Sequence, residues 1–201
     1  MAVSHARRPA DPDAPNDPEV EAAFAVAPAT VVAEILAGEL HTMPRPRLRH
    51  ARTATRLVRR LAVFDDEPGE PGGWVLLLEP ELHVGPKPDK LVPDIAGWRR
   101  EHLPAHVFDL DAPGHVSIAP DWVCEVLSDR TERIDRTTKM GIYRRERVRN
   151  VWLVSPLLET LEVYHHDGDR WTLLDTFEGD AVVRAEPFDA IEVSLASLWA
   201  R

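Results

Sequence analysis

Residues 122–127 read Trp-Val-Cys-Glu-Val-Leu, an apolar run that a single acid, Glu125, interrupts. A short apolar run of this length is typical of a fully buried strand, and a carboxylate in such a strand is costly to bury unless it has a partner or a function. The segment that follows predicts a helix, because Asp135, Lys139 and Tyr143 recur every four residues and would share one face. The fold is therefore predicted to form around a central strand that carries an acid and leads into a helix.

Short apolar runs bounded by turn residues predict further strands on both sides of this unit. An arginine-rich segment predicts an amphipathic helix, because Ala54, Leu57 and Leu61 recur at spacings of three and four. Residues 30–40 fit either a helix or a strand-turn-strand, and Gly38 favours the turn. The order of these elements predicts a mixed α/β (α+β) fold that ends in β-hairpins. The predicted strands are 74–79, a short piece ending at 84, 91–98, 122–127, 151–154, 161–165, 171–177 and 181–185, and the predicted helices are 50–64, 129–149 and, as a helix or turn, 195–199.

The composition is that of a globular chain, since 44 % of the 201 residues are hydrophobic and 29 % are charged. Residues 1–28 are rich in Pro, Ala and Asp without apolar periodicity, which predicts a flexible tail, and residues 29–201 are then predicted to form one domain. The single cysteine, Cys124, allows no disulfide within the chain and no cysteine-based zinc site. No apolar run approaches the ~20 residues that span a bilayer, so we expect a cytoplasmic protein without a membrane anchor.

The charges are unevenly distributed along the chain. The net charge of −10 argues against general attraction to nucleic acid, because phosphate-binding surfaces use Lys and Arg. Residues 45–60, however, contain seven arginines and no acid, and residues 130–149 contain eight Lys or Arg. These segments predict basic surfaces that would flank a nucleic acid, although a solvated helix face explains the arginine-rich helix equally well.

Three ionisable residues lie where a core would prefer apolar ones: Asp94 after Pro93 at the start of one extended segment, Glu125 within the next, and Lys139 on the following helix. Two buried carboxylates around a divalent cation form an oxygen-ligand site of the kind that holds Mg²⁺. If the two acids lie on adjacent strands and point to the same side, they could share this ion, with the backbone carbonyl of Val126 as a further ligand. The ion would polarise a phosphodiester and lower the pKa of a bound water, and Lys139 would offset the developing charge.

These motifs occur in an order that is typical of one protein family. They are Pro93-Asp94-Ile95-Ala96, residues 119–128, Asp135 with Lys139 and Tyr143, and Val151-Trp152-Leu153-Val154-Ser155-Pro156. The chain resembles the Uma2 (DUF820) family of restriction endonucleases, within the PD-(D/E)XK nuclease superfamily, from about residue 30 to residue 199.

The resemblance implies a restriction-endonuclease-like mixed central sheet flanked by helices, with DNA as the partner and Mg²⁺ as the cofactor, for which Mn²⁺ could substitute. It also implies that the active-site lysine has moved to Lys139, because Leu127 occupies the position that the usual motif gives to lysine. Glu34 and His50 match positions that are common in the family, and both are additional candidates for the site.

Glu79 lies on the predicted strand before Asp94 and is the candidate for a third acidic group near the metal. Each candidate also has a simpler explanation. Asp94 after a proline can cap a turn, Glu125 can pair with an arginine, and Lys139 can form a solvated ion pair on its helix. Glu79 can lie in a surface loop, and His50 can be a histidine at the start of a helix.

The sequence therefore predicts a magnesium-dependent endonuclease that hydrolyses DNA phosphodiester bonds, with Asp94, Glu125 and Glu79 around the metal and Lys139 stabilising charge. The alternative is a catalytically inactive nuclease-fold module that binds nucleic acid or a partner protein. A homodimer would suit the first function, because double-strand cleavage needs two centres and two-fold dimers are the commonest oligomers.

Overall fold

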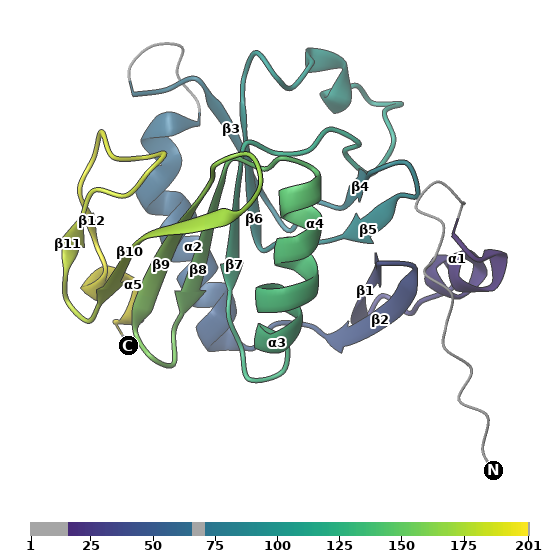
Figure 1. Ribbon diagram of the computed structural model, residues 1–201, viewed down its shortest axis with the longest axis horizontal. Coiled ribbons are helices and arrows are strands. Elements are labelled where there is room, and N and C mark those ends of the chain that lie inside the picture. The colour runs from purple at the N-terminus through teal and green to yellow at the C-terminus, as the bar shows by residue number, and fades with distance from the viewer. Residues whose placement is uncertain (1–15, 66–70, 201) are drawn as a thin grey trace.

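The computed structural model describes residues 16–65 and 71–200. Its centre is a six-stranded sheet in the order β10-β9-β8-β7-β6-β3 (Figure 1). Strands β7 and β8 run parallel, and every other neighbouring pair in this sheet is antiparallel. The mixed sheet of an α+β fold is therefore confirmed. Its strands are β3 (Trp74–Leu78), β6 (Ile95–Arg99), β7 (Trp122–Val126), β8 (Asn150–Ser155), β9 (Thr160–His166) and β10 (Trp171–Glu178).

The parallel pair needs a crossover connection, and the helical segment after β7 supplies it. This crossover consists of α3 (Glu132–Ile134), a π-helical segment (Asp135–Lys139) and α4 (Met140–Arg145). It covers one face of the sheet, while α2 (Leu48–Leu61) covers the opposite face (Figure 1). The central strands β7 and β8 are consequently buried on both sides, as the continuous apolar run of β7 predicts.

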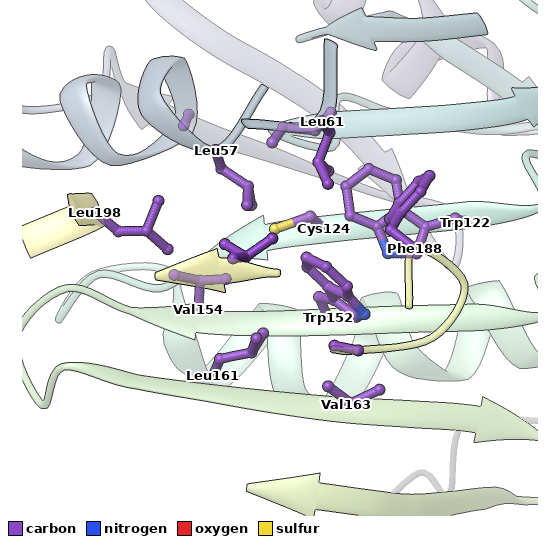
Figure 2. Packing of buried hydrophobic residues seen from close by; sticks show 14 of the residues in the cluster. Leu57, Leu61, Trp122, Cys124, Trp152, Val154, Leu161, Val163, Phe188 and Leu198 are labelled. Atoms are coloured by element: carbon purple, nitrogen blue, oxygen red, sulfur yellow. The ribbon is translucent and has the colours of Figure 1, made fainter. Parts of the chain in front are cut away.

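The alternation of side chains along β7 divides the core in two. Trp122 and Cys124 belong to the cluster that packs under α2 (Figure 2), whereas Val123 belongs to the cluster under α4. Because successive side chains of a strand point to opposite faces, Glu125 shares the face of Val123. The acid of the central strand therefore points toward the helical segment that carries Lys139.

A smaller sheet in the order β2-β1-β5-β4 lies beside the central one (Figure 1). Strands β1 and β2 form a hairpin whose turn residues, Ala37 and Gly38, have positive φ angles of 52° and 80°, as a tight hairpin turn requires. The strand-turn-strand prediction for residues 30–40 is thus confirmed. The remaining elements are β1 (Val31–Leu36), β2 (Glu39–Pro44), β4 (Leu82–Val84), β5 (Asp89–Leu91), β11 (Val182–Val183), β12 (Val193–Ser194) and α5 (Ala196–Trp199).

The predicted tail, residues 1–28, lies partly outside the described residues. Its later part contains helix α1 (Pro18–Ala25), and Asp17 caps the first turn of this helix with its side chain. Glu21 of α1 forms an ion pair with Lys90 of β5. The tail prediction is therefore wrong for α1, because an N-cap and a contact with a distant strand stabilise a helix that the composition does not reveal. The domain boundary at residue 29 stays a prediction.

The predicted strand 91–98 is divided between the two sheets. Leu91 is the last residue of β5, and Ile95 is the first residue of β6. Pro93 lies between the two strands, where its lack of a backbone N–H interrupts the strand ladder. The predicted helix 129–149 is present, but its middle is π-helical, a rare geometry that is frequent at functional sites. None of the helices in the described part of the chain is long and apolar enough to cross a membrane.

Gly97 of β6 lies in a tightly packed part of the central sheet. A Cβ atom added there would be 2.8 Å from Leu76 Cδ2 and 3.2 Å from the ring of Trp122. We expect Gly97→Ala to lower the free energy of unfolding by about 1–3 kcal/mol, as overpacking does. In the control Gly141→Ala, the added Cβ meets nothing within 4 Å, and the helix propensity of alanine should raise stability by up to about 1 kcal/mol. Denaturant unfolding measures both, and shifts of the same sign would contradict this packing.

Candidate functional site

A cavity of about 310 Å³ opens between the small sheet, the start of β6 and the helical crossover. Four carboxylates and one lysine line its inner part, and exposed arginines line its outer part. An acidic interior therefore lies beneath a basic rim. The inner residues are Glu34, Asp94, Glu125, Asp135 and Lys139, and the rim arginines are Arg45, Arg47, Arg49 and Arg130.

Strand pairing brings the inner carboxylates together. Glu34 lies on β1 and is fully buried. Asp94 immediately precedes Ile95, which pairs with Cys124 of β7, so Asp94 lies across from Glu125 on the neighbouring strand. The structure thus brings the two predicted acids to one cavity, while their role as metal ligands stays a prediction.

Lys139 lies among these carboxylates. Its Nζ is 3.0 Å from Glu34 Oε1, 3.3 Å from Glu125 Oε1 and 3.5 Å from Asp135 Oδ1. Burial by itself would lower the pKa of Lys139, but the surrounding carboxylates raise this pKa well above its usual value, so the side chain is charged. A solvated ion pair on the helix surface does not describe this lysine, because Lys139 and its three partners are all buried.

Glu125 is buried in the interface between the sheet and the crossover. Burial raises the pKa of Glu125 well above its usual value, and the nearby Asp135 and Asp94 raise it further. Lys139 and a hydrogen bond from Tyr143 act in the opposite direction. The phenol of Tyr143 donates to Glu125 Oε1 at 2.5 Å, which fixes the orientation of the carboxylate. Burial and Glu125 raise the pKa of Tyr143, so the phenol keeps its proton.

His50 lies in the first turns of α2 and contacts Asp94. Its Nε2 is 3.1 Å from Asp94 Oδ2, an oxygen that also accepts a hydrogen bond from the backbone N–H of Val126 at 2.7 Å. Burial would lower the pKa of His50, but Asp94 and a hydrogen bond to the backbone of Val126 raise it above its usual value. His50 therefore orients Asp94 from the side of α2. Whether the Val126 carbonyl binds a metal stays a prediction.

Glu79 lies at the edge of the cavity rather than in its interior. It follows the last residue of β3 and has a positive φ of 47°. Its side chain is 43 % exposed and is 3.6 Å from the guanidinium of Arg45. Its backbone N–H donates to the carbonyl of Asp94, so it is adjacent to the acidic group through the backbone. Of the additional candidates, Glu34 is the carboxylate beside Lys139, with its Oε1 3.0 Å from the ammonium nitrogen.

The donor set suits a hard divalent cation. Four carboxylates in the inner part of the cavity face one lysine and one histidine there, so the acidic groups of this inner part outnumber the basic ones. Glu34 Oε2 and His50 Nδ1 are buried and have no hydrogen-bond partner, a costly state unless a ligand or water is bound. Mg²⁺ prefers carboxylate oxygens. Among the described residues, these acids do not form a group of three with all ligand atoms within 4.8 Å, and the Lys139 ammonium lies within 3.5 Å of three of them.

Asp135 and Tyr143 belong to the site, although the sequence placed them only on a helix face. Both are buried, and both contact residues of the cavity through Lys139 or Glu125. The available signal was their spacing of four residues on either side of Lys139. That spacing also fits ion pairs on a helix surface, so the sequence alone did not distinguish a buried site from an exposed helix face.

The fold is also found in a solved crystal structure. It is described as a "putative nuclease belonging to DUF820" from Anabaena variabilis, with a TM-score of 0.67 and 21 % sequence identity, and the match covers 84 % of this chain and 90 % of that chain. This chain therefore shares the fold of that protein. The chain belongs to the Uma2 family, described as "Putative restriction endonuclease", whose sequence profile matches residues 20–196. This match begins within α1, ahead of the predicted boundary at residue 29. No curated protein matches the chain.

Proposed function

We propose that this protein is a magnesium-dependent endonuclease that hydrolyses DNA phosphodiester bonds at the acidic cavity. The observation that carries the proposal is the arrangement of charge: buried carboxylates around Lys139, beneath exposed arginines. An oxygen-rich interior is suited to a hard cation, and an arginine rim is suited to the phosphates of the substrate. Membership of the Uma2 family supports the same activity.

Each residue has a separate part in this proposal. Asp94 and Glu125 would hold the ion, with Glu34 as the third carboxylate because it is buried beside them, and the Val126 carbonyl as a further ligand. Glu79 would assist from the edge, where its carboxylate lies 3.6 Å from the guanidinium of Arg45. Mg²⁺, or Mn²⁺ in its place, would supply Lewis acidity and a more acidic bound water. Lys139 would stabilise negative charge at the phosphate, while Tyr143 and His50 hold the two ligand carboxylates in place.

The direct test is cleavage of supercoiled plasmid and of single-stranded DNA by the purified chain, with and without millimolar Mg²⁺ or Mn²⁺. We expect nicking that depends on the ion, together with a rise in the melting temperature, because a ligand that binds only the folded state stabilises it. No cleavage and no thermal shift with either ion would refute the proposal. The same cleavage assay with an RNA substrate determines whether the protein distinguishes DNA from RNA.

One observation favours the alternative of an inactive binding module. Lys139 already forms ion pairs with three carboxylates, as it would in a purely structural ion-pair network. Such a module would bind DNA through the arginine rim without any response to Mg²⁺. DNA binding without cleavage and without a cation-dependent thermal shift would therefore identify this second function.

The arginine rim gives a prediction about DNA affinity. Arg47 and Arg49 line the cavity and are exposed. We expect the double substitution Arg47→Gln and Arg49→Gln to weaken DNA binding and to reduce the slope of log K against log salt by about 0.9 for each phosphate that is no longer neutralised. Arg59→Gln is the matched control, because Arg59 is an exposed arginine of the same helix α2 that does not line the cavity. Equal effects of the two changes in a fluorescence anisotropy titration would contradict a specific rim.

Homodimerisation is part of the same proposal. Cleavage of both strands of a duplex by one binding event needs two centres, and a two-fold dimer supplies them. Light scattering of the purified chain, with and without duplex DNA, tests this. A monomer that only nicks one strand would contradict the dimer but not the hydrolytic activity.

A further inference from the structure

Three side chains outside the cavity bring potential metal ligands together. Glu81 and His83 flank Leu82, the first residue of β4, and His115 lies in the long connection between β6 and β7. One ligand atom from each residue lies within 4.8 Å of the other two, and this is the one such group of three or more in the described residues. None of the three lines the acidic cavity.

Backbone hydrogen bonds hold these residues in place. The N–H of Val116 donates to the carbonyl of Glu81 at 2.9 Å, and the N–H of His83 donates to the carbonyl of Val116 at 2.9 Å. Leu82 and Val116 form a parallel β-bridge, and both are buried. These hydrogen bonds hold the connection between β6 and β7 against β4. His115 therefore lies next to His83 because of the backbone pairing.

The His83 side chain contacts the side chains of both Glu81 and His115. His83 Nε2 is 2.7 Å from Glu81 Oε1, and the rings of His83 and His115 are stacked with centroids 3.7 Å apart and an interplanar angle of 11°. In this stack the ring nitrogens direct their lone pairs within two nearly parallel planes, so one ring must turn about its side-chain torsions for both rings to bind one ion. The neutral ring is the form that binds metals.

We propose that Glu81, His83 and His115 form a binding site for a divalent transition-metal ion of the zinc type. Two imidazoles and one carboxylate are a borderline donor set that favours Zn²⁺, Co²⁺ or Ni²⁺ over Mg²⁺, and three protein ligands leave one position of a tetrahedral ion to water. The acidic cavity differs in this respect, because its donors are carboxylate oxygens. The two sites therefore select different metals.

The ion would have a structural effect that follows from its place in the fold. It would link β4 to the connection of residues 100–121, which holds only a short 3-10 helix, Ala105–Phe108, as regular structure. A cross-link of this kind stabilises the folded state by mass action, because the three ligands converge only after folding. The site is independent of the proposed nuclease activity and would exist equally in an inactive binding module.

The test uses the full chain, stripped of metal with a chelator and dialysed. Titration with Zn²⁺ by calorimetry should give one site per chain in addition to any binding at the cavity, and Co²⁺ should give a visible absorption spectrum when it binds. Zn²⁺ should also raise the melting temperature, and Mg²⁺ should not replace it at this site. Absence of Zn²⁺ binding at micromolar concentrations would overturn the proposal.

Variants assign the binding to these residues. His115→Ala and His115→Gln should each weaken Zn²⁺ binding by more than the roughly 10–100-fold that a change outside the ligand shell causes, with an unchanged circular dichroism spectrum. His106→Ala is the matched control, because His106 is an exposed histidine of the same connection outside the group. Glu125→Gln should leave the Zn²⁺ site intact, which separates it from the cavity. Unchanged Zn²⁺ affinity in both His115 variants would refute the assignment.

Discussion

Glu125→Gln is expected to reduce metal-dependent DNA cleavage by at least about 1,000-fold. The change removes one of the two carboxylates that are proposed to hold the ion, and metal-ion catalysis is worth several kcal/mol, each 1.4 kcal/mol being tenfold in rate. The fold should survive, because burial raises the pKa of Glu125 and thus already disfavours its charged form. A neutral amide of the same size removes this cost, and its oxygen can still accept the hydrogen bond from Tyr143.

The appropriate control is Glu132→Gln, which makes the same chemical change on the crossover that follows β7. Glu132 is 41 % exposed and pairs with Arg136 on the helix surface, so its loss should leave the cleavage rate within about twofold and the stability within about 0.5 kcal/mol. Plasmid nicking rates and melting temperatures should be compared with and without Mg²⁺. Full activity of Glu125→Gln would show that this carboxylate does not take part in the reaction.

Lys139→Met is expected to lower the free energy of unfolding by about 3–5 kcal/mol, the cost of removing one partner from a buried ion pair. Lys139 is 4 % exposed, and its ammonium nitrogen lies within 3.5 Å of three carboxylates. Methionine fills much of the same volume but leaves Glu34, Glu125 and Asp135 without a counter-charge. Cleavage should fall in the same variant, because the charge that Lys139 supplies to the phosphate is lost as well.

Divalent cations and pH give this prediction further readouts. Millimolar Mg²⁺ should restore part of the lost stability, because it replaces the missing positive charge.

Since the pKa of Lys139 is raised above its unfolded value, the stability from its charge is fully present below about pH 10.4. That stability is lost only as pH rises through the higher folded pKa. The difference between wild type and variant should therefore persist from pH 7 to pH 9.

Arg133→Met is the control for the loss of a cation from the same helical segment. Arg133 is exposed on α3, so its replacement should change the stability by no more than about 0.5 kcal/mol. Chemical denaturation of both variants measures the comparison. A Lys139→Met protein as stable as the control would mean that the buried carboxylates are protonated and need no counter-charge.

The central part of the fold could be predicted because its signals are local. The apolar run of β7 predicts burial on both faces, and the alternation of its side chains determines that Glu125 shares a face with Val123. The four-residue spacing around Lys139 predicts one helix face, which the structure keeps even though the segment is π-helical. The turn at Gly38 has a positive φ, which is why glycine there favoured a hairpin over a helix.

Other features depend on contacts between distant parts of the chain. Helix α1 is stabilised by Lys90, which lies 69 residues further along. Strand β3 ends at Leu78, one residue before Glu79. Glu79 itself has a positive φ, and its side chain lies at the cavity edge. The group of Glu81, His83 and His115 exists because a β-bridge joins two segments that show no metal-binding spacing in sequence.

The sequence by itself determined the mixed α+β class, the family, the central strand with its acid, and Asp94, Glu125 and Lys139 as residues to examine. Periodicity and propensity act over a few neighbouring residues, so one chain suffices to show them. Only the tertiary structure decided that Glu34 and Asp135 lie beside Lys139 and that Glu79 lies at the cavity edge. It also decided that His83 and His115 lie close to Glu81. The physical reason is that burial and electrostatic pairing depend on distances in space, which strand order and crossover connections set.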